Sequence, residues 1–237
     1  QIAKKKLPTW FQNNEVLYPV RLSMEQCSSE VTAKYKTRII NSGRGIDLTG
    51  GFGVDSIFLS KKCESLIYCE RNEDLASLVT HNFKALNQDN CEVYIGDGVE
   101  YLKNLKKIDL IFVDPSRRKE SQRVYRLEDC EPNVIDLIGL FFDKAKRVLI
   151  KTAPLLDIRQ TLSNLEAVKE VHVIAVNNDC KEVLYLLEKD FIGEPQIFSV
   201  NLKKEHKEEF RFSLSEEREA LTQYSEPLEY IYEANAA

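Results

Sequence analysis

Short apolar segments alternate with amphipathic segments between about residues 44 and 190. Apolar residues dominate 65–70 and 108–113, as is typical of strands that are covered on both faces of a parallel sheet. Between such runs, apolar residues recur at near-helical spacing, for example in 73–86. This alternation predicts an α/β fold whose parallel strands are joined by right-handed crossovers.

The same pattern places each element. We expect strands at 46–48, 65–70, 91–95, 108–113, 147–150, 171–176 and 183–187, and helices at 54–60, 73–86, 100–105, 132–142 and 155–165. A short polar turn joins the last two strands, so they form a hairpin and add an antiparallel strand. The fold class predicted is α/β, with a Rossmann-like, mostly parallel seven-stranded sheet that ends in a closing antiparallel hairpin.

Two segments flank this predicted sheet. Residues 1–43 contain a candidate helix at 29–40, for which Ser28 or Ser29 is a suitable cap. From about residue 191 the composition shifts, and we expect strands at 196–202 and 209–214 with a short helix near 215. The pattern therefore predicts an N-terminal helical segment (1–43), the sheet domain (44–190) and part of a small α+β domain (191–237). The chain does not begin with Met, which suggests a fragment of a longer protein.

Composition narrows the class of protein. The 237 residues are 43% hydrophobic and 30% charged, with a formal net charge of -5, which argues against coating nucleic acid by charge alone. A local basic patch on an RNA-modifying enzyme stays compatible with that charge. No apolar run approaches the roughly 20 residues of a membrane span, and residues 1–6 do not read as a secretory signal, because no apolar stretch with a cleavage site follows them. The six cysteines lack CxxC spacing, so we expect reduced thiols, no metal site and a cytoplasmic protein.

A glycine-rich loop at 47–53 joins the first predicted strand to a helix. Gly51 and Gly53 let the backbone turn sharply and approach a ligand, while Thr49 stands beside them. The acidic residue at the strand end, Asp47, can hold the loop amides or bind an ammonium group. Taken alone, such a loop could also be a tight turn without a ligand, because glycine motifs of this kind are weak signals.

Acidic residues end the next two predicted strands. Glu70 lies a little over twenty residues beyond the loop, where a carboxylate can accept hydrogen bonds from ribose hydroxyls. Asp97, followed by Gly98, could take an adenine amino group or could cap the following helix. Because the carboxyl ends of parallel strands share one edge, where ligands of such sheets bind, these acids predict a nucleotide-type cofactor site.

The fourth predicted strand ends in Asp114 and Pro115, followed by Ser116 and Arg117. The Asp114 side chain and the Pro115 carbonyl could both accept hydrogen bonds from a planar amine and aim its lone pair at a methyl donor. Arg117 could contact a phosphate or a base. A β-turn with solvated arginines is the alternative reading. Lys151, after the fifth strand, is more typical of a strand end than of a catalytic group.

These motifs, in this order, resemble class I S-adenosylmethionine-dependent methyltransferases over roughly 44–189. The resemblance implies that Asp47, Thr49, Gly51, Gly53, Glu70, Asp97 and Gly98 bind S-adenosylmethionine, and that Asp114, Pro115 and Arg117 are catalytic. The loop with Thr49 is similar to that of a ribosomal RNA guanine-N2 methyltransferase group. Asp114-Pro115 resembles the start of the Asp/Asn-Pro-Pro-aromatic motif of amino-group methyltransferases, although Ser116-Arg117 departs from it.

The segments 22–30, 47–55, 114–118 and 232–237 together resemble the bacterial methyltransferases that carry a C-terminal THUMP-like domain. The segment before the sheet is also similar to the helix of trimethylguanosine synthase that lies over the cofactor. By that resemblance Gln26, Ser28 and Ser29 reach the methionine end. The appended domain implies an RNA substrate, tRNA or rRNA.

The leading hypothesis is therefore an enzyme that methylates a base amino group of RNA by direct in-line transfer. Two alternatives come from other classes. One is a catalytically degenerate methyltransferase fold that acts as an RNA-binding module, against which the intact cofactor loop argues. The other is a nicotinamide-dependent oxidoreductase on the same sheet, which Asp97, Asp114-Pro115 and the terminal hairpin disfavour.

Overall fold

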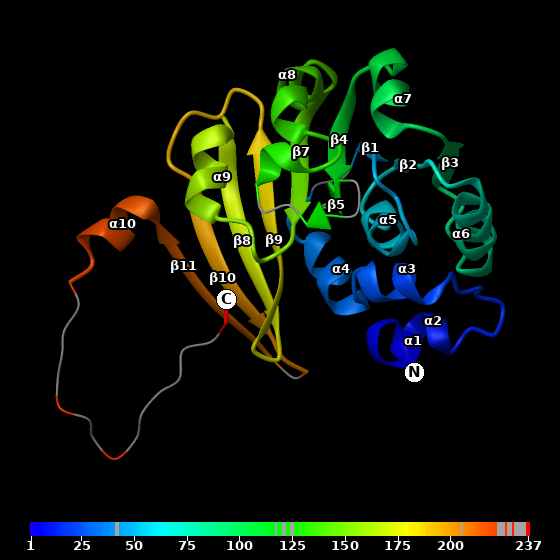
Figure 1. The fold of residues 1–237 in the computed structure, drawn as a ribbon, viewed down its shortest axis with the longest axis horizontal. Coiled ribbons are helices and arrows are strands. Elements are labelled where there is room, and N and C mark those ends of the chain that lie inside the picture. The colour runs from blue at the N-terminus through cyan, green and yellow to red at the C-terminus, as the bar shows by residue number, and fades with distance from the viewer. Residues whose placement is uncertain are drawn as a thin grey trace.

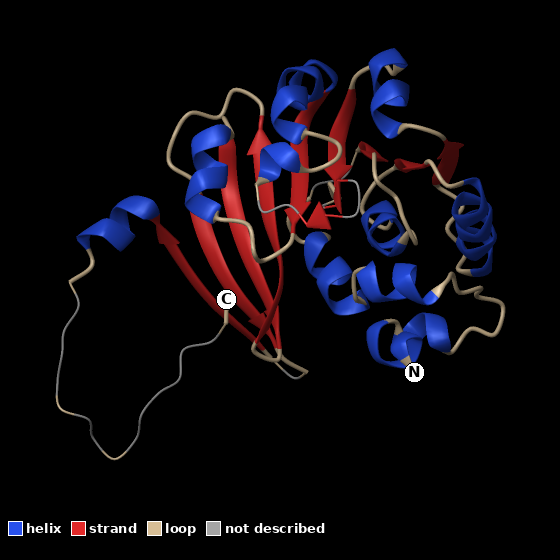
Figure 2. Cartoon of the chain, in the orientation of Figure 1, coloured by secondary structure: helices blue, strands red, loops and turns tan. Residues whose placement is uncertain are grey.

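A mixed β-sheet spans the molecule and carries helices on both faces (Figures 1 and 2). The computed structural model describes residues 1–40, 43–116, 118–119, 122–123, 126–204, 206–221, 226, 229 and 236–237. The helices are α1 (Ile2–Lys6), α2 (Pro8–Phe11), α3 (Arg21–Gln26), α4 (Glu30–Lys36), α5 (Val54–Ser60), α6 (Glu73–Ala85), α7 (Gly98–Asn104), α8 (Val134–Lys144), α9 (Ile158–Asn164) and α10 (Leu214–Glu219), with a 3-10 turn at Leu127–Asp129. The strands are β1 (Arg44–Asp47), β2 (Ser65–Glu70), β3 (Cys91–Ile95), β4 (Ile108–Val113), β5 (Arg118–Lys119), β6 (Gln122–Arg123), β7 (Ala145–Thr152), β8 (Val168–Val176), β9 (Asp179–Glu188), β10 (Gln196–Leu202) and β11 (Lys207–Ser213).

The first half of the sheet is parallel. Strands β3, β2, β1, β4 and β7 lie side by side in that order, and β1 pairs in parallel with both β2 and β4. Asp47, the last residue of β1, stands opposite Tyr68 on one side and Phe112 on the other. This register brings the carboxyl ends of the parallel strands to one edge, as the sequence pattern predicts.

The other half of the sheet is mixed and is larger than predicted. Strand β9 lies antiparallel between β7 and β8, which confirms the predicted hairpin of β8 and β9. The prediction of seven strands is wrong, because β10 pairs in parallel with β8, and β11 pairs antiparallel with β10. The sheet of the described residues has nine strands, and the two strands assigned to a separate small domain extend it. The domain boundary at residue 191 stays a prediction.

Alternating side chains of the strands pack against helices on opposite faces. On one face Ile111 and Val113 of β4 join a core to which α7, α8 and α9 contribute. On the other face Leu110 and Phe112 of the same strand pack with residues of α4 and α5. A strand covered on both faces has no polar side, which is why 108–113 reads as an almost continuous apolar run.

The N-terminal segment packs beside α5 and α6 on the second face. Trp10 is buried, and its ring meets the ring of Phe52 edge-on with the centroids 5.1 Å apart. Lys6 donates from Nζ to the main-chain carbonyls of Glu25 (2.6 Å) and Cys27 (2.9 Å), so it satisfies carbonyls that the end of α3 leaves unpaired. Asn82 of α6 is fully buried and forms two hydrogen bonds, each 2.8 Å long, with the main chain of Leu17.

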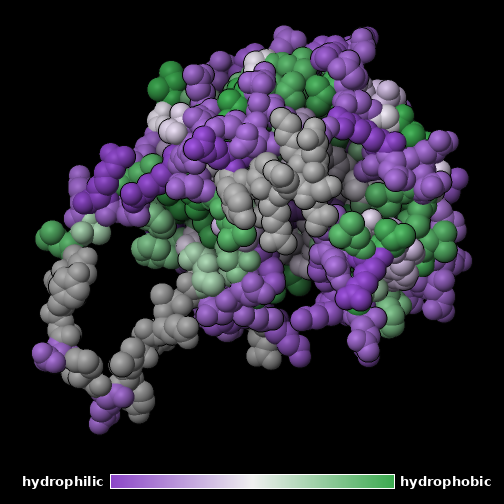
Figure 3. Space-filling view, viewed as in Figure 1, coloured by the Kyte–Doolittle hydropathy of each residue, from purple (hydrophilic) through white to green (hydrophobic). Residues whose placement is uncertain are grey.

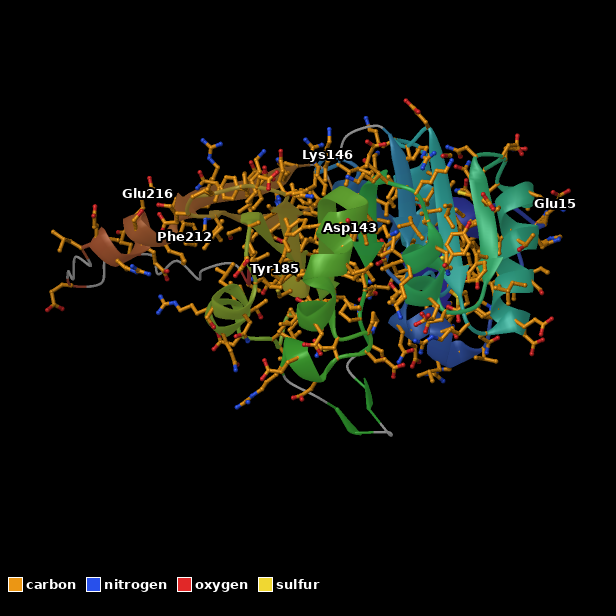
Figure 4. All side chains as sticks on the ribbon, turned by 90° about the horizontal axis from the view of Figure 1, so that it is seen from above. Glu15, Asp143, Lys146, Tyr185, Phe212 and Glu216 are labelled. Atoms are coloured by element: carbon orange, nitrogen blue, oxygen red, sulfur yellow. The ribbon has the colours of Figure 1, made fainter. Side chains whose placement is uncertain are left out.

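The long axis of the molecule follows the order of the strands. Seen from above, Glu216 and Phe212 lie toward one end and Glu15 toward the other, with Tyr185 and Asp143 between them (Figure 4). The face in Figure 3 is mainly hydrophilic, with scattered hydrophobic areas between the polar side chains. Within the described ranges, none of the helices has the length and apolar character needed to cross a membrane.

We predict that Asn82→Ala weakens the attachment of the N-terminal segment. The substitution removes both side-chain bonds and leaves the N–H and C=O groups of Leu17 without their partners. The free energy of unfolding should fall by about 1–3 kcal/mol, because two hydrogen bonds of a fully buried side chain are lost. Urea denaturation of the variant measures the change. Asn104→Ala, an exposed residue that donates only to the carbonyl of Glu100, should change it by less than about 0.5 kcal/mol.

Candidate functional site

A cleft of about 750 Å³ opens at the carboxyl edge of the parallel strands. We call it the central cleft. Most of the site residues predicted from the sequence line it, namely Gln26, Ser28, Asp47, Thr49, Gly51, Gly53, Glu70, Asp97, Gly98, Asp114 and Pro115. Ser29 does not line it, and Arg117 lies outside the described residues. The topology thus brings together residues from four strand ends and from the N-terminal segment.

The glycine loop adopts the sharp turn that its composition predicts. Gly51 and Gly53 have φ angles of 54° and 76°, a left-handed conformation that favours glycine. A Cβ atom at Gly53 would come within 2.8 Å of Val79 in α6, so the loop also sits closely on that helix. The helix α5 begins directly after Gly53. The loop is therefore held by local conformation and by packing before any ligand binds.

Asp47 organises this loop from within. Its Oδ1 accepts a hydrogen bond from the amide of Thr49 (2.9 Å), and its Oδ2 accepts one from the hydroxyl of Ser56 (2.5 Å). The residue is only 1% exposed, and burial raises its pKa to about 7 although both hydrogen bonds favour the carboxylate. Of the two roles predicted for Asp47, holding the loop amides is the one that these contacts support.

Glu70 supports the same loop from β2. Its Oε2 accepts a hydrogen bond from the amide of Gly51 (3.0 Å), and its Oε1 accepts one from the amide of Asn72 (2.8 Å). A carboxylate offers about four lone-pair sites, so two further hydrogen bonds can still be accepted from the cleft. The position agrees with the predicted ribose-binding role, which itself stays a prediction.

Asp97 is engaged more fully than the sequence suggested. Its Oδ1 accepts from the amides of Val99 (2.8 Å) and Glu100 (3.0 Å), so it caps α7, as the alternative reading had it. Its Oδ2 pairs with Arg71 at 2.5 Å, and Arg71 also pairs with Glu131 at 2.6 Å. All three residues line the central cleft. The predicted contact with an adenine amino group stays a prediction, and Arg71 would share the carboxylate with it.

Thr49 connects the loop to the far wall of the central cleft. Its Oγ1 accepts a hydrogen bond from the amide of Asp114 (2.7 Å) and lies 3.5 Å from Oδ1 of Asp47. Asp114 itself follows β4 directly. The start of the loop and the end of β4 are therefore joined through one hydroxyl group.

Asp114 belongs to a set of five ionisable side chains that we call the charge cluster: Lys36, Asp55, Asp114, Lys151 and Glu182. Nζ of Lys151 contacts Oδ2 of Asp114 and lies 3.3 Å from Oδ2 of Asp55. Nζ of Lys36, which is fully buried, lies 3.0 Å from Oδ1 of Asp55 and 2.5 Å from Oε1 of Glu182. Each ammonium group thus stands between two carboxylates.

Burial opposes the charges of Asp55, Lys151 and Glu182, and neighbouring opposite charges offset it. For Asp55 the two lysines outweigh burial and lower its pKa to about 2. For Lys151 burial is likewise outweighed, and the carboxylates of Asp114, Asp55 and Glu182 raise its pKa well above the ordinary value. For Glu182 burial prevails and the pKa is raised. Lys151 therefore carries a positive charge at neutral pH.

The N-terminal segment supplies one edge of the central cleft. Gln26 ends α3 and Ser28 follows it, and the hydroxyl of Ser28 donates to Oδ2 of Asp55 at 2.6 Å. Ser29 instead caps α4, where its side chain accepts from the amide of Thr32. Its oxygen is thus used within the helix, and the predicted contact of Ser29 with the cofactor stays a prediction.

Sequence reasoning missed Lys36, Asp55 and Glu182 as site residues, and it favoured a strand-end role for Lys151. A signal was present for two of them. Lys36 lies one helical turn after Thr32, on the buried side of α4, and Glu182 directly precedes the buried run 183–187. Charged residues in register with a buried face need partners of opposite charge. Their partners are distant in the chain, so the pattern indicates only that partners exist.

Metal ligation is not indicated where the structure can be read. In the described part of the chain, no group of three or more His, Cys, Asp or Glu side chains is placed to hold a metal ion.

Comparisons with known proteins place this site in a family. A family model described as conserved hypothetical protein 95 matches residues 13–171. A crystal structure from Porphyromonas gingivalis W83, of a protein assigned as a methyltransferase, is 37% identical to the chain, covers 95% of it and superposes with a TM-score of 0.86. The chain spans 58% of the length of that protein. The ribosomal RNA small subunit methyltransferase J of Bdellovibrio bacteriovorus is 31% identical over 93 residues, which are 37% of each chain.

A more distant structure shares the fold and was solved with a ligand. It belongs to a protein assigned as a methyltransferase and solved in complex with S-adenosylhomocysteine (SAH), the demethylated product of the cofactor. It is 11% identical, covers 62% of this chain and 45% of its own, and superposes with a TM-score of 0.51, so the likeness is one of fold. The chain therefore belongs to the family described as conserved hypothetical protein 95 and carries a methyltransferase domain of the S-adenosylmethionine-dependent class.

Proposed function

We propose that this chain binds S-adenosylmethionine in the central cleft and transfers its methyl group directly to RNA. One observation carries the proposal. Asp47, Glu70 and Asp97, from three successive strand ends, line a single cleft together with the glycine loop, and Asp114 lines the same cleft from the next strand. A helix cap or a tight turn explains each residue alone, but neither explains why all of them share one cavity.

The residues fit the cofactor by their chemistry. Glu70 retains lone pairs for two ribose hydroxyls, and a Cβ atom at Gly51 would meet nothing closer than 3.8 Å, so the loop leaves room for a ligand. At Gly98 a Cβ atom would come within 2.5 Å of the carbonyl oxygen of Leu48, so only glycine allows α7 to begin this close to the loop. Gln26 and Ser28 line the same cleft, and we assign to them the methionine end of the cofactor. Bound there, the cofactor would supply an electrophilic methyl group.

RNA is the proposed substrate class for two reasons. The rRNA methyltransferase of Bdellovibrio bacteriovorus is a sequence relative, and the segment from residue 191 resembles the start of a THUMP-like domain, which implies RNA. We keep tRNA and rRNA as candidates and the cytoplasm as the place of action. Neither a degenerate fold nor a nicotinamide-dependent oxidoreductase finds support in the relatives named above.

The acceptor atom depends on the surroundings of Asp114. The sequence pattern favours a base amino group as the methyl acceptor. The Asp114 carboxylate and the Pro115 carbonyl could accept hydrogen bonds from the N–H groups of such an amine. The contact of Lys151 with Oδ2 of Asp114 is an addition that the pattern did not include. An ammonium group at this point changes which acceptor the site favours.

We predict that Glu70→Ala weakens binding of S-adenosylmethionine about tenfold to 100-fold, the range expected for losing hydrogen bonds to a charged group. The variant also frees the amide of Gly51, which adds to the loss. Isothermal titration calorimetry measures the dissociation constant. Glu73→Ala, an exposed residue in the first turn of α6, serves as the matched control and should bind like the native chain. Equal affinities in all three proteins would contradict the proposed cofactor site.

We predict that Asp47 makes the stability of the apo-protein depend on pH between about 4 and 7. Its pKa rises from 3.8 to about 7 on folding, so its contribution is present below pH 4 and is lost as pH rises through 7. The loss is at most about 1.4 kcal/mol for each pH unit in this window. Urea denaturation at several pH values should show a steeper decline for the native chain than for Asp47→Asn. Parallel declines would show that Asp47 keeps its ordinary pKa.

We predict that the protein transfers labelled methyl groups from S-adenosylmethionine to RNA from a total pool. Nucleoside digestion followed by mass spectrometry identifies the product. A protein with Asp47→Ala, which loses both loop contacts, serves as the inactive comparison. Label found only on protein or on small molecules would exclude RNA as the substrate.

A further inference from the structure

Lys151 presents a positive charge to the acceptor side of the central cleft. It lies near the end of β7, lines the cleft and contacts Oδ2 of Asp114, while its side chain is only 11% exposed. Asp114 lines the cleft beside it and is 36% exposed. Any group that reaches Asp114 from the cleft therefore comes close to an ammonium group that water screens poorly.

The rest of the charge cluster holds this ammonium group in place. Asp55 lies 3.3 Å from Nζ of Lys151, and Asp55 is in turn held by Lys36 at 3.0 Å and by the hydroxyl of Ser28 at 2.6 Å. Lys36 is fixed on its other side by Glu182 at 2.5 Å. These partners come from α4, α5 and β9, so the position of Lys151 is determined by three separate elements. Burying this many charges costs free energy, and a lysine on the surface would neutralise Asp114 without that cost. Neutralising Asp114 therefore does not by itself explain the cluster, whereas holding the Lys151 ammonium group in place does.

A fixed positive charge distinguishes between two kinds of methyl acceptor. An amino nitrogen becomes more positive as it attacks a methyl group, so a neighbouring ammonium group raises the barrier. A hydroxyl oxygen becomes more negative as its proton leaves, so the same ammonium group lowers the barrier. Lys151 is charged at neutral pH and cannot take up that proton, but the adjacent carboxylate of Asp114 can. The pair therefore suits a hydroxyl acceptor.

We propose that the methyl acceptor is the ribose 2′-hydroxyl of RNA, with Asp114 and Lys151 as catalytic residues and Lys36, Asp55 and Glu182 as positioning residues. The proposal rests on the proposed function and specifies its acceptor, because the 2′-hydroxyl is the hydroxyl that each nucleotide within an RNA chain carries. The hydroxyl oxygen forms a bond to the methyl carbon, and the bond between that carbon and the sulfonium sulfur breaks with its electron pair on sulfur. The hydroxyl proton passes to Asp114 and then to water.

The acceptor can be tested with the native chain alone. RNA labelled by the protein should yield nucleosides methylated on ribose, and the phosphodiester bond after each such nucleoside should resist alkali, because alkaline cleavage needs a free 2′-hydroxyl. An oligonucleotide with a 2′-deoxy sugar at the mapped position should accept no label. Methylation of a base nitrogen would overturn the inference and leave the proposed function standing. The absence of label from RNA would overturn the proposed function itself.

The role of Lys151 can be tested with matched variants. Lys151→Met should lower the transfer rate at least about 100-fold, while binding of S-adenosylhomocysteine, measured by calorimetry, should change by less than about threefold. Lys146→Met, on the same strand but exposed, is the control and should keep the native rate (Figure 4). If Lys151→Met does not fold, Lys151→Arg keeps the charge and should retain folding, with a reduced rate because the charge is displaced. A native transfer rate in folded Lys151→Met would exclude a catalytic role.

Discussion

Burial of charge beneath the central cleft is the constraint on which the arrangement of the site depends. Removing one partner from a buried ion pair typically costs 3–5 kcal/mol, because the remaining charge is left uncompensated. Lys36 pairs with both Asp55 and Glu182, which belong to α5 and β9. The helix α4 is therefore tied to both elements by electrostatics as well as by the apolar packing of Tyr35. The N-terminal segment that forms one edge of the cleft is fixed through the same contacts.

The sheet could be predicted from the sequence where its strands are covered on both faces. Segments such as 65–70 and 108–113 are apolar because helices lie on either side of them, and no other local structure explains such runs as well. The helices α1, α2 and α3 were not predicted individually, because none exceeds six residues and helical periodicity needs more. Strands β10 and β11 were predicted, but their place was not. Pairing β10 in parallel with β8 is a long-range arrangement that local patterns do not encode.

The same distinction between local and long-range features applies to the site. The cofactor side was predictable because glycine and acidic residues at strand ends are local features, and Asp47, Glu70 and Asp97 do meet at one cleft. On the acceptor side, Asp114 and Pro115 were predicted and line the cleft, while the predicted Arg117 lies outside the described residues. Lys36 and Glu182 stand in register with buried faces, so the pattern indicates that each has a partner, but it does not indicate that a residue on α4 meets one on β9. Arg71 was missed for a related reason, because its partners Asp97 and Glu131 are 26 and 60 residues away in the chain.

Thr49 makes the glycine loop an integral part of the domain that holds it. Its hydroxyl oxygen accepts a hydrogen bond from the main-chain amide of Asp114 and lies beside the carboxylate of Asp47. A loop with glycine at this position could be transplanted from another protein of the same fold and would still turn correctly. It would nevertheless leave the main chain after β4 without its anchor. Because the donor is a main-chain amide, any residue except proline after β4 would keep this bond, whereas position 49 needs a side chain that can accept it.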